Sequence, residues 1–196
     1  MPTAIEIPRL ISVMLELDKL KGVSRQSLVL GGLRRENSAE HSWHTATALM
    51  LLSQVCGHEV DVLKLLKMAL VHDICEIDYG DTSIYASDRS EKSGQESACM
   101  NRIRDMCPEL MDEFRELWLE YEGQVTHESR LLKVADRILP LILNVESQGK
   151  SWQEQGIRRS QVLAVNQTVK EVMPELYIWI EKQVDAAVQR GWLLDS

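Results

Sequence analysis

Apolar residues recur at helical spacing along most of this chain. The first repeat follows an i, i+3, i+4, i+7 pattern and predicts an amphipathic helix; its members are Ile7, Leu10, Ile11, Met14 and Leu17. The same spacing predicts further helices at about 38–56, 61–73, 95–106, 108–122 and 128–146. A final helical region is expected at about 160–190, with a break near Pro174. The pattern therefore predicts an all-α fold, a single-domain bundle of six or seven helices.

Polar residues and glycines indicate where these helices begin and end. Ser38 is the expected N-cap of the second helix, and Gly57 is expected to end it. The segments 78–93 and 148–155 are rich in polar residues and are predicted to form a loop and a connection. The 5 prolines and 10 glycines are too few to separate many short strands.

Composition and charge narrow the function classes. The 196 residues are 44% hydrophobic and 27% charged, which is typical of a globular protein. The net charge of -8 excludes a general attraction to nucleic acid polymers or anionic membranes, but a small phosphorylated substrate needs only a local patch. The longest charge-free run, 42–58, is too short to span a bilayer, and the first residues show no secretory signal. The four cysteines form no CxxC pair, so reduced thiols and a cytoplasmic location are expected.

Ionisable side chains interrupt three of the predicted apolar faces. The apolar row on the third helix continues at the same spacing into His72, Asp73 and Glu76. Asp136 adjoins the apolar face of its own helix, and His41 begins a row on the second helix. A carboxylate on a buried face needs a cation, a hydrogen-bonding partner or solvent, so these positions call for a chemical explanation.

Two interpretations of these residues remain open. Two imidazoles and two carboxylates suit a divalent ion such as Mn, Co, Fe, Ni or Zn. The ligands would then be His41, His72, Asp73 and Asp136. Alternatively, a buried histidine–aspartate hydrogen bond and one salt-bridged aspartate account for the same pattern.

Four segments resemble the HD-domain phosphohydrolase superfamily, whose ligand signature is H…HD…D. They are EHSWHTA at 40–46, LVHDICE at 70–76, YGDTS at 79–83 and KVADRI at 133–138. Within the superfamily the similarity is to the 5'-deoxynucleotidase-like branch: RREN precedes the first histidine, and Gly80-Asp81 follows the HDxxE motif. The resemblance covers about residues 5–146. It implies one HD domain over 1–196, with the region at about 160–190 packed on that core.

The resemblance also implies roles for individual residues. The implied metal ligands are His41, His72, Asp73 and Asp136. Glu76 and Asp81 match residues that act in catalysis in that branch, and Arg25 matches, within one position, an arginine that contacts substrate. The chain departs from the branch at Gln26, where the nucleotidases carry an aromatic residue. This departure bears on nucleotide specificity and leaves the metal site intact.

A basic cluster precedes the first of these motifs in an otherwise acidic chain. Its members are Lys19, Lys21, Arg25, Arg34 and Arg35. Most of them are expected to be solvated surface cations, whereas Arg25 and Arg34 are expected to bind the phosphate of a substrate. Arg137, next to the ligand Asp136, is a third candidate.

The remaining histidines have simpler expectations. His44 lies three residues after His41 and is expected near the ligands as an outer partner, whereas His58 and His127 are expected at the surface. Under the metal hypothesis, a metal-bound water attacks phosphorus, with Glu76 and Asp81 sharing the acid and base roles in an order that the sequence leaves open.

The prediction is a metal-dependent phosphomonoesterase acting on a (deoxy)nucleoside 5'-monophosphate or a similar small phosphate. An alarmone pyrophosphate hydrolase is an alternative, but Ile77 stands where that branch favours an acidic residue. A catalytically idle HD module that binds a nucleotide or a regulatory partner, and a purely structural helical protein, are the others. A triphosphohydrolase is usually longer, and a dinuclear oxygenase needs more histidines. The family resemblance further implies a homodimer.

Overall fold

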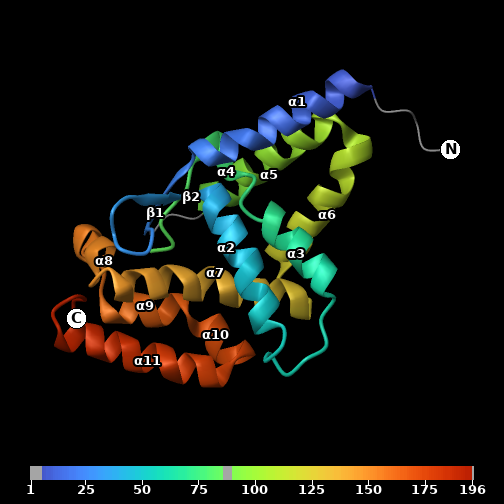
Figure 1. The fold of residues 1–196 in the computed structure, drawn as a ribbon. Coiled ribbons are helices and arrows are strands. Elements are labelled where there is room, and N and C mark those ends of the chain that lie inside the picture. The colour runs from blue at the N-terminus through green and yellow to red at the C-terminus, as the bar shows by residue number, and fades with distance from the viewer. Residues whose placement is uncertain (1–5, 86–89, 196) are drawn as a thin grey trace.

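The computed structural model describes residues 6–85 and 90–195, and these residues are mostly helical (Figure 1). The elements of this part of the chain are α1 (Ile7–Asp18), η1 (Lys19–Gly22), β1 (Ser24–Leu28), β2 (Arg35–Asn37), α2 (Ser38–Leu52), α3 (Val62–Val71), α4 (Glu76–Tyr79), α5 (Ser90–Met106), α6 (Pro108–Gly123), α7 (His127–Glu146), α8 (Lys150–Gln155), α9 (Arg159–Val165), α10 (Gln167–Val172) and α11 (Pro174–Gln189). The all-α prediction is confirmed, although these helices outnumber the six or seven expected. Within the described ranges, no helix combines the length and the apolar character that crossing a bilayer requires.

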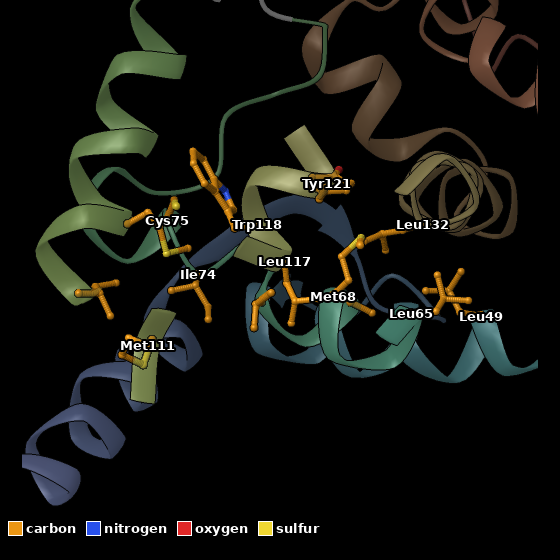
Figure 2. Close-up of a cluster of buried hydrophobic side chains, with 14 of the residues drawn as sticks. Leu49, Leu65, Met68, Ile74, Cys75, Met111, Leu117, Trp118, Tyr121 and Leu132 are labelled. Carbon is orange, nitrogen blue, oxygen red and sulfur yellow. The ribbon is translucent and has the colours of Figure 1, made fainter. Parts of the chain in front are cut away.

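Helix α7 runs through the middle of the fold and contributes to both hydrophobic clusters (Figure 1). Its Leu132 belongs to the first cluster, where Figure 2 shows it together with Leu49 of α2 and Met68 of α3. Its Val134 belongs to the second cluster, which also takes in α9, α10 and α11. Because its two faces are apolar, α7 must be covered on both sides, and the polar residues on it have no easy access to water.

The region at 160–190 forms three helices instead of one. The break expected near Pro174 is confirmed, because α11 begins at that residue. A second break follows α9, where the buried Asn166 donates a side-chain hydrogen bond to the carbonyl of Val162 at 2.8 Å. An amide that bonds to the preceding turn in this way competes with continued helix formation.

Two segments expected to lack helix contain short helices. The connection predicted at 148–155 is wrong, since α8 lies there; its Trp152 is fully buried, and Gly149 and Gly156 flank it with φ of 71° and 62°. A buried aromatic anchor thus outweighs the polar character of the segment. The loop predicted at 78–93 includes the end of α4 and the start of α5, and residues 86–89 lie outside the described residues.

A small antiparallel hairpin of β1 and β2 precedes α2, and no sequence pattern predicted it. The hairpin buries two charged residues, Arg25 and Glu36, instead of an apolar row. It leads directly into α2, whose N-cap is Asn37 and not Ser38: the Asn37 side chain accepts from the Glu40 N–H, and the Glu40 carboxylate accepts from the Asn37 N–H. This capping box leaves the Ser38 hydroxyl available for another partner.

Candidate metal centre

The four predicted ligands come from three parts of the fold and meet at one point. His41 lies in the first turn of α2, His72 and Asp73 follow α3, and Asp136 lies midway along α7. His41 Nε2 is 3.3 Å from an Asp136 oxygen and 3.8 Å from Asp73 Oδ2. His72 Nε2 is 3.3 Å from that same Asp73 oxygen. The structure therefore brings together all four side chains.

The early end of α3 makes this meeting possible. The helix was expected to continue through Asp73, but it ends at Val71. The Glu76 N–H then bonds to the Asp73 carbonyl, three residues back, at 3.0 Å. Neighbouring side chains on a regular helix diverge by about 100°. Leaving the regular helix at His72 therefore allows it and Asp73 to face the same point.

The histidine nitrogens are oriented as metal ligands would be. His72 Nδ1 lies 2.8 Å from the carbonyl oxygen of Ala69, which places the proton on Nδ1. The other nitrogen, Nε2, is buried and has no hydrogen-bond partner, so its lone pair is free for a cation. Ligand atoms of His41, His72 and Asp73 all lie within 4.8 Å of one another. These three residues, with Asp136 beside them, could hold one ion.

The charges around the centre leave room for a divalent cation. The ion pairs there join five carboxylates, those of Glu36, Asp73, Glu76, Asp81 and Asp136. The cations among them are Arg25, Lys133 and Arg137. Without counting the histidines, these carboxyl groups outnumber the arginine and lysine side chains by two, so a divalent ion would offset part of the repulsion among the carboxylates.

The two histidines respond differently to this field. Burial lowers the pKa of His72 below its ordinary value. Burial and the charge of Arg25 also oppose protonation of His41, but the carboxylates of Asp136 and Glu36 beside its ring outweigh them and raise its pKa to about 9. The ring of His41 thus lies in strongly negative surroundings, which favour any cation placed beside it.

The two aspartates are held in their ionised form. Burial alone would raise the pKa of Asp136, but the charges of Arg137 and Lys133 and a hydrogen bond from His41 keep it well below the ordinary value. Burial also opposes ionisation of Asp73, but the neighbouring cationic groups lower its pKa. Carboxylates must be deprotonated to bind metal, so both residues are ready to do so.

Arg25 joins the candidate ligands to the candidate catalytic carboxylates. Its buried guanidinium Nη1 lies 2.8 Å from Asp73 Oδ2 and 3.5 Å from both Glu76 Oε1 and Asp81 Oδ1. The backbone N–H of Gln26 donates to the other Asp81 oxygen at 3.0 Å. The hairpin therefore positions Asp81 as well as Arg25, and the predicted functional residues form one connected group.

The surroundings of Glu76 change its acidity strongly. Burial, and then the charge of Asp73, raise its pKa well above the ordinary glutamate value, although Arg25 acts in the opposite direction. Ser38 Oγ lies 2.5 Å from Glu76 Oε2 and can donate to the carboxylate. The same hydroxyl can accept from the protonated carboxyl, so Glu76 has a partner in both states. Such a group holds a proton at a higher pH than an ordinary carboxyl group does, which suits it to proton transfer.

A cavity of about 240 Å³ adjoins the centre, and its lining includes two residues that the sequence did not single out. The Tyr121 hydroxyl donates to Asp136 Oδ2 at 3.1 Å and accepts from Lys133 Nζ at 2.8 Å. The Lys133 ammonium also lies 4.7 Å from the centre of the Tyr121 ring. Lys133 stands in the KVADRI segment three residues before Asp136, so its position on the helix could have indicated it. Tyr121 had no such signal.

The predicted phosphate-binding arginines have different environments. Arg137 is buried and lines the cavity, with Nη1 3.7 Å from Asp136 Oδ2. Arg34 is not among the residues that line this cavity; its exposed guanidinium pairs with the two carboxylate oxygens of Glu40 at 2.7 and 2.8 Å. The other basic residues form surface ion pairs, as expected: Lys19 with Glu16, Lys21 with Asp18 and Arg35 with Glu154.

The remaining histidines lie away from the buried pair. His44, expected as an outer partner of the ligands, stacks on the exposed Trp43 with ring centres 6.2 Å apart. His58 and His127 are exposed, as predicted, and they stack on each other at 4.6 Å.

Comparison with known proteins identifies the fold. A family model for the HD domain matches residues 17–177, most of the chain and all four candidate ligands. This chain belongs to the HD-domain family. A crystal structure from Magnetospirillum magnetotacticum, described as a predicted metal-dependent phosphohydrolase, is 36% identical to this HD-domain protein. It superposes with a TM-score of 0.88, covering 97% of this chain and 100% of the other.

Named relatives of this HD-domain protein occur among eukaryotes. The 5'-deoxynucleotidase HDDC2 of Dictyostelium discoideum is 32% identical over 127 residues, which is 61% of this chain and 67% of that protein. The human protein of the same name is 32% identical over 124 residues, 61% of this chain and 58% of its own length. The matching part thus spans about three fifths of these relatives.

Proposed function

We propose that this HD-domain protein is a metal-dependent phosphohydrolase that releases phosphate from a (deoxy)nucleoside 5'-monophosphate or a similar small ester. One observation supports the reaction above all others: two imidazoles and two aspartates meet beside a cavity that also contains Arg25, Lys133 and Arg137. Metal ligands next to cationic side chains are the parts that phosphate-ester hydrolysis requires. The names of the relatives support the nucleotide class of substrate.

His41 and His72 would hold one divalent ion through Nε2, together with the carboxylates of Asp73 and Asp136. Mixed nitrogen and oxygen ligands suit Mn, Co, Fe, Ni or Zn. When bound, such an ion lowers the pKa of its water and polarises a phosphoryl oxygen.

Arg25 and Arg137 are the proposed phosphate-binding groups. Both guanidinium groups are buried beside the centre, where the low dielectric strengthens their attraction for an anion. Arg34 is not among the proposed phosphate-binding groups, because it does not line the cavity and its exposed guanidinium pairs with Glu40.

Glu76 is the proposed general base and Asp81 the proposed general acid. Glu76 takes the proton of the attacking water, while Ser38 turns its hydroxyl to match the protonation of the carboxyl group. The new P–O bond forms as the ester P–O bond breaks. Asp81, which takes up a proton from solvent before this step, gives that proton to the leaving 5'-oxygen, and Glu76 afterwards releases its proton to solvent. The Gln26 N–H keeps Asp81 oriented toward the cavity that it lines.

The test is a phosphate-release assay on deoxy- and ribonucleoside 5'-monophosphates with added Mn²⁺ or Co²⁺. Glu76→Gln should lower kcat roughly 10²- to 10⁴-fold, the usual contribution of a general base. The variant should still bind Mn²⁺, because Glu76 is not a ligand in this proposal. Glu113→Gln, at an exposed carboxylate paired with Lys67, serves as the control and should retain full activity. If no ester is hydrolysed, or if Glu76→Gln stays fully active, the proposal is wrong; the idle-module alternative predicts the first result.

We also propose that the protein is a homodimer, paired through the outer face of α2. Trp43, Met50, Leu51 and Val55 on and just after this helix are all at least half exposed. Apart from two histidines, Glu40 is the one ionisable residue in α2. Two copies that each have a net charge of -8 repel each other, and an uncharged apolar face allows close approach. Light scattering should give a dimer that Leu51→Glu converts to a monomer; a monomeric wild type contradicts the proposal.

A further inference from the structure

Glu36 is a buried carboxylate without a hydrogen bond on one of its oxygens. It lies in β2 with 4% of its surface exposed, and Oε2 has no partner within bonding distance. His41 Nδ1 lies 3.6 Å from this oxygen and Arg25 Nε lies 3.8 Å from it. Both of these nitrogens are also buried and also lack a hydrogen-bond partner. Three unsatisfied atoms, one acceptor and two potential donors, therefore meet at a single point.

Such an arrangement is destabilising unless the three atoms form hydrogen bonds with one another. A buried donor or acceptor without a partner is costly, and most native structures contain few of them. The distances exceed a hydrogen bond by less than 1 Å, since N–H···O bonds are usually close to 2.9 Å. Hydrogen bonds in enzyme sites are often long before ligands bind and shorten afterwards.

His72 has a hydrogen-bond partner at Nδ1 that His41 lacks. His72 Nδ1 bonds to the Ala69 carbonyl at 2.8 Å, and this bond fixes the ring with Nε2 toward the centre. His41 has no backbone carbonyl at its Nδ1; the nearest acceptor given by the structure is Glu36 Oε2. Outer partners of this kind orient ligand imidazoles and strengthen metal binding in many proteins.

We propose that Glu36 is a positioning residue, which accepts from His41 Nδ1 and from Arg25 Nε when the centre holds its ion. This inference deepens the proposed function and rests on it. The Glu36 carboxylate then fixes the orientation of both the His41 ring, which binds the metal, and the Arg25 guanidinium, which binds the phosphate. The hairpin and the capping box give Glu36 a fixed place, because Asn37, the next residue, begins α2.

The test measures metal affinity, which does not depend on turnover. Metal-free protein is titrated with Mn²⁺, and the free ion is followed by its paramagnetic resonance signal. Glu36→Ala should raise the Kd for Mn²⁺ about 10- to 100-fold, as outer-partner substitutions typically do. Glu36→Gln should cause a smaller loss, because an amide oxygen still accepts a hydrogen bond but has no charge. Glu154→Ala removes an exposed carboxylate that pairs with Arg35, the neighbour of Glu36, and should leave the Kd within about twofold.

A second readout uses the wild-type protein, so the test does not depend on variants that fold. In the Zn²⁺-loaded protein, nitrogen–proton NMR should show a His41 Nδ1 proton that exchanges slowly, like that of His72. The exposed His58 gives the fast reference. The proposal is overturned if the His41 proton exchanges as fast as the His58 proton, or if folded Glu36→Ala binds Mn²⁺ like the wild type. If Glu36→Ala binds Mn²⁺ more weakly but the wild-type protein hydrolyses no ester, the positioning role of Glu36 is supported and the proposed reaction is wrong. The failure of one proposal can therefore be distinguished from the failure of the other.

Discussion

Tyr121 links the candidate ligand Asp136 to the half-buried Lys133, and its hydroxyl can be removed without removing the ring. The hydroxyl donates to Asp136 at 3.1 Å and accepts from Lys133 at 2.8 Å. In Tyr121→Phe both charged groups lose one hydrogen bond in a place that water reaches poorly. The aromatic ring, which meets His72 edge-on at 5.4 Å, stays in the variant.

The expected loss follows from these two contacts. A hydrogen bond to a charged group contributes about 1.5–3 kcal/mol when its partner is removed. Asp136 keeps contacts to His41 and Arg137, so we expect the lower part of that range, about 2 kcal/mol in the free energy of unfolding. Tyr177→Phe is a matched control: Tyr177 is buried, lies under Lys170, and accepts one uncharged hydrogen bond, from Gln167 at 3.0 Å. Its expected loss is about 1 kcal/mol.

Urea unfolding of the metal-free variants measures both losses. The Kd for Mn²⁺ provides a second measurement, which Tyr121→Phe should raise several-fold and Tyr177→Phe should leave unchanged, because only the first tyrosine holds a ligand. The reasoning is refuted if Tyr121→Phe loses no more stability than Tyr177→Phe and binds Mn²⁺ with unchanged affinity.

Three further predictions concern the surroundings of the site. Gly149→Ala should destabilise the protein by about 3 kcal/mol and Gly156→Ala by about 1 kcal/mol, because both have positive φ but a Cβ at Gly149 would collide with the backbone of the C-terminal segment; equal losses on thermal unfolding would contradict this. Burial opposes ionisation of Glu16, but hydrogen bonds from Lys19 and Arg102 lower its pKa below the ordinary value of 4.5. The ionised carboxylate therefore stabilises the fold fully above pH 4.5, and this stabilisation is lost as the pH falls through the lowered pKa. Arg102→Met should therefore cost about 1–3 kcal/mol at neutral pH and less in acid, as urea unfolding at both pH values would reveal, and a constant difference argues against it. Arg34→Ala should leave kcat and KM within about twofold in the phosphate-release assay, because Arg34 does not line the cavity and its guanidinium pairs with Glu40. A large rise in KM would show that Arg34 binds substrate.

The helices were predictable from sequence where an apolar stripe is buried, and the hairpin was not. In α3 and α7 the apolar residues repeat at helical spacing, so periodicity found both. The strands β1 and β2 bury Arg25 and Glu36, which inverts the usual alternation of apolar and polar residues. In α8 a single buried side chain, Trp152, outweighs a polar segment. Local pattern cannot detect elements that depend on one distant contact.

The sequence predicted the candidate ligands but not the residues that hydrogen-bond to the site. His72 and Asp136 interrupt apolar faces and also match a motif, so two independent signals agree. Ser38 and Tyr121 join the site through contacts between distant parts of the sequence. Ser38 bonds to Glu76, 38 residues away, and Tyr121 bonds to Asp136, 15 residues away. Arg34 differs from these residues: it was expected to bind substrate, and in the structure its guanidinium pairs with the carboxylate of Glu40.

The proposed reaction requires two histidines and two aspartates to hold one divalent ion. Crystals grown with Mn²⁺ allow an anomalous-difference map to locate that ion. We expect a single strong peak within bonding distance of Nε2 of His41, Nε2 of His72 and the carboxylates of Asp73 and Asp136. A map with no peak there, and with those atoms hydrogen-bonded to one another, would contradict it.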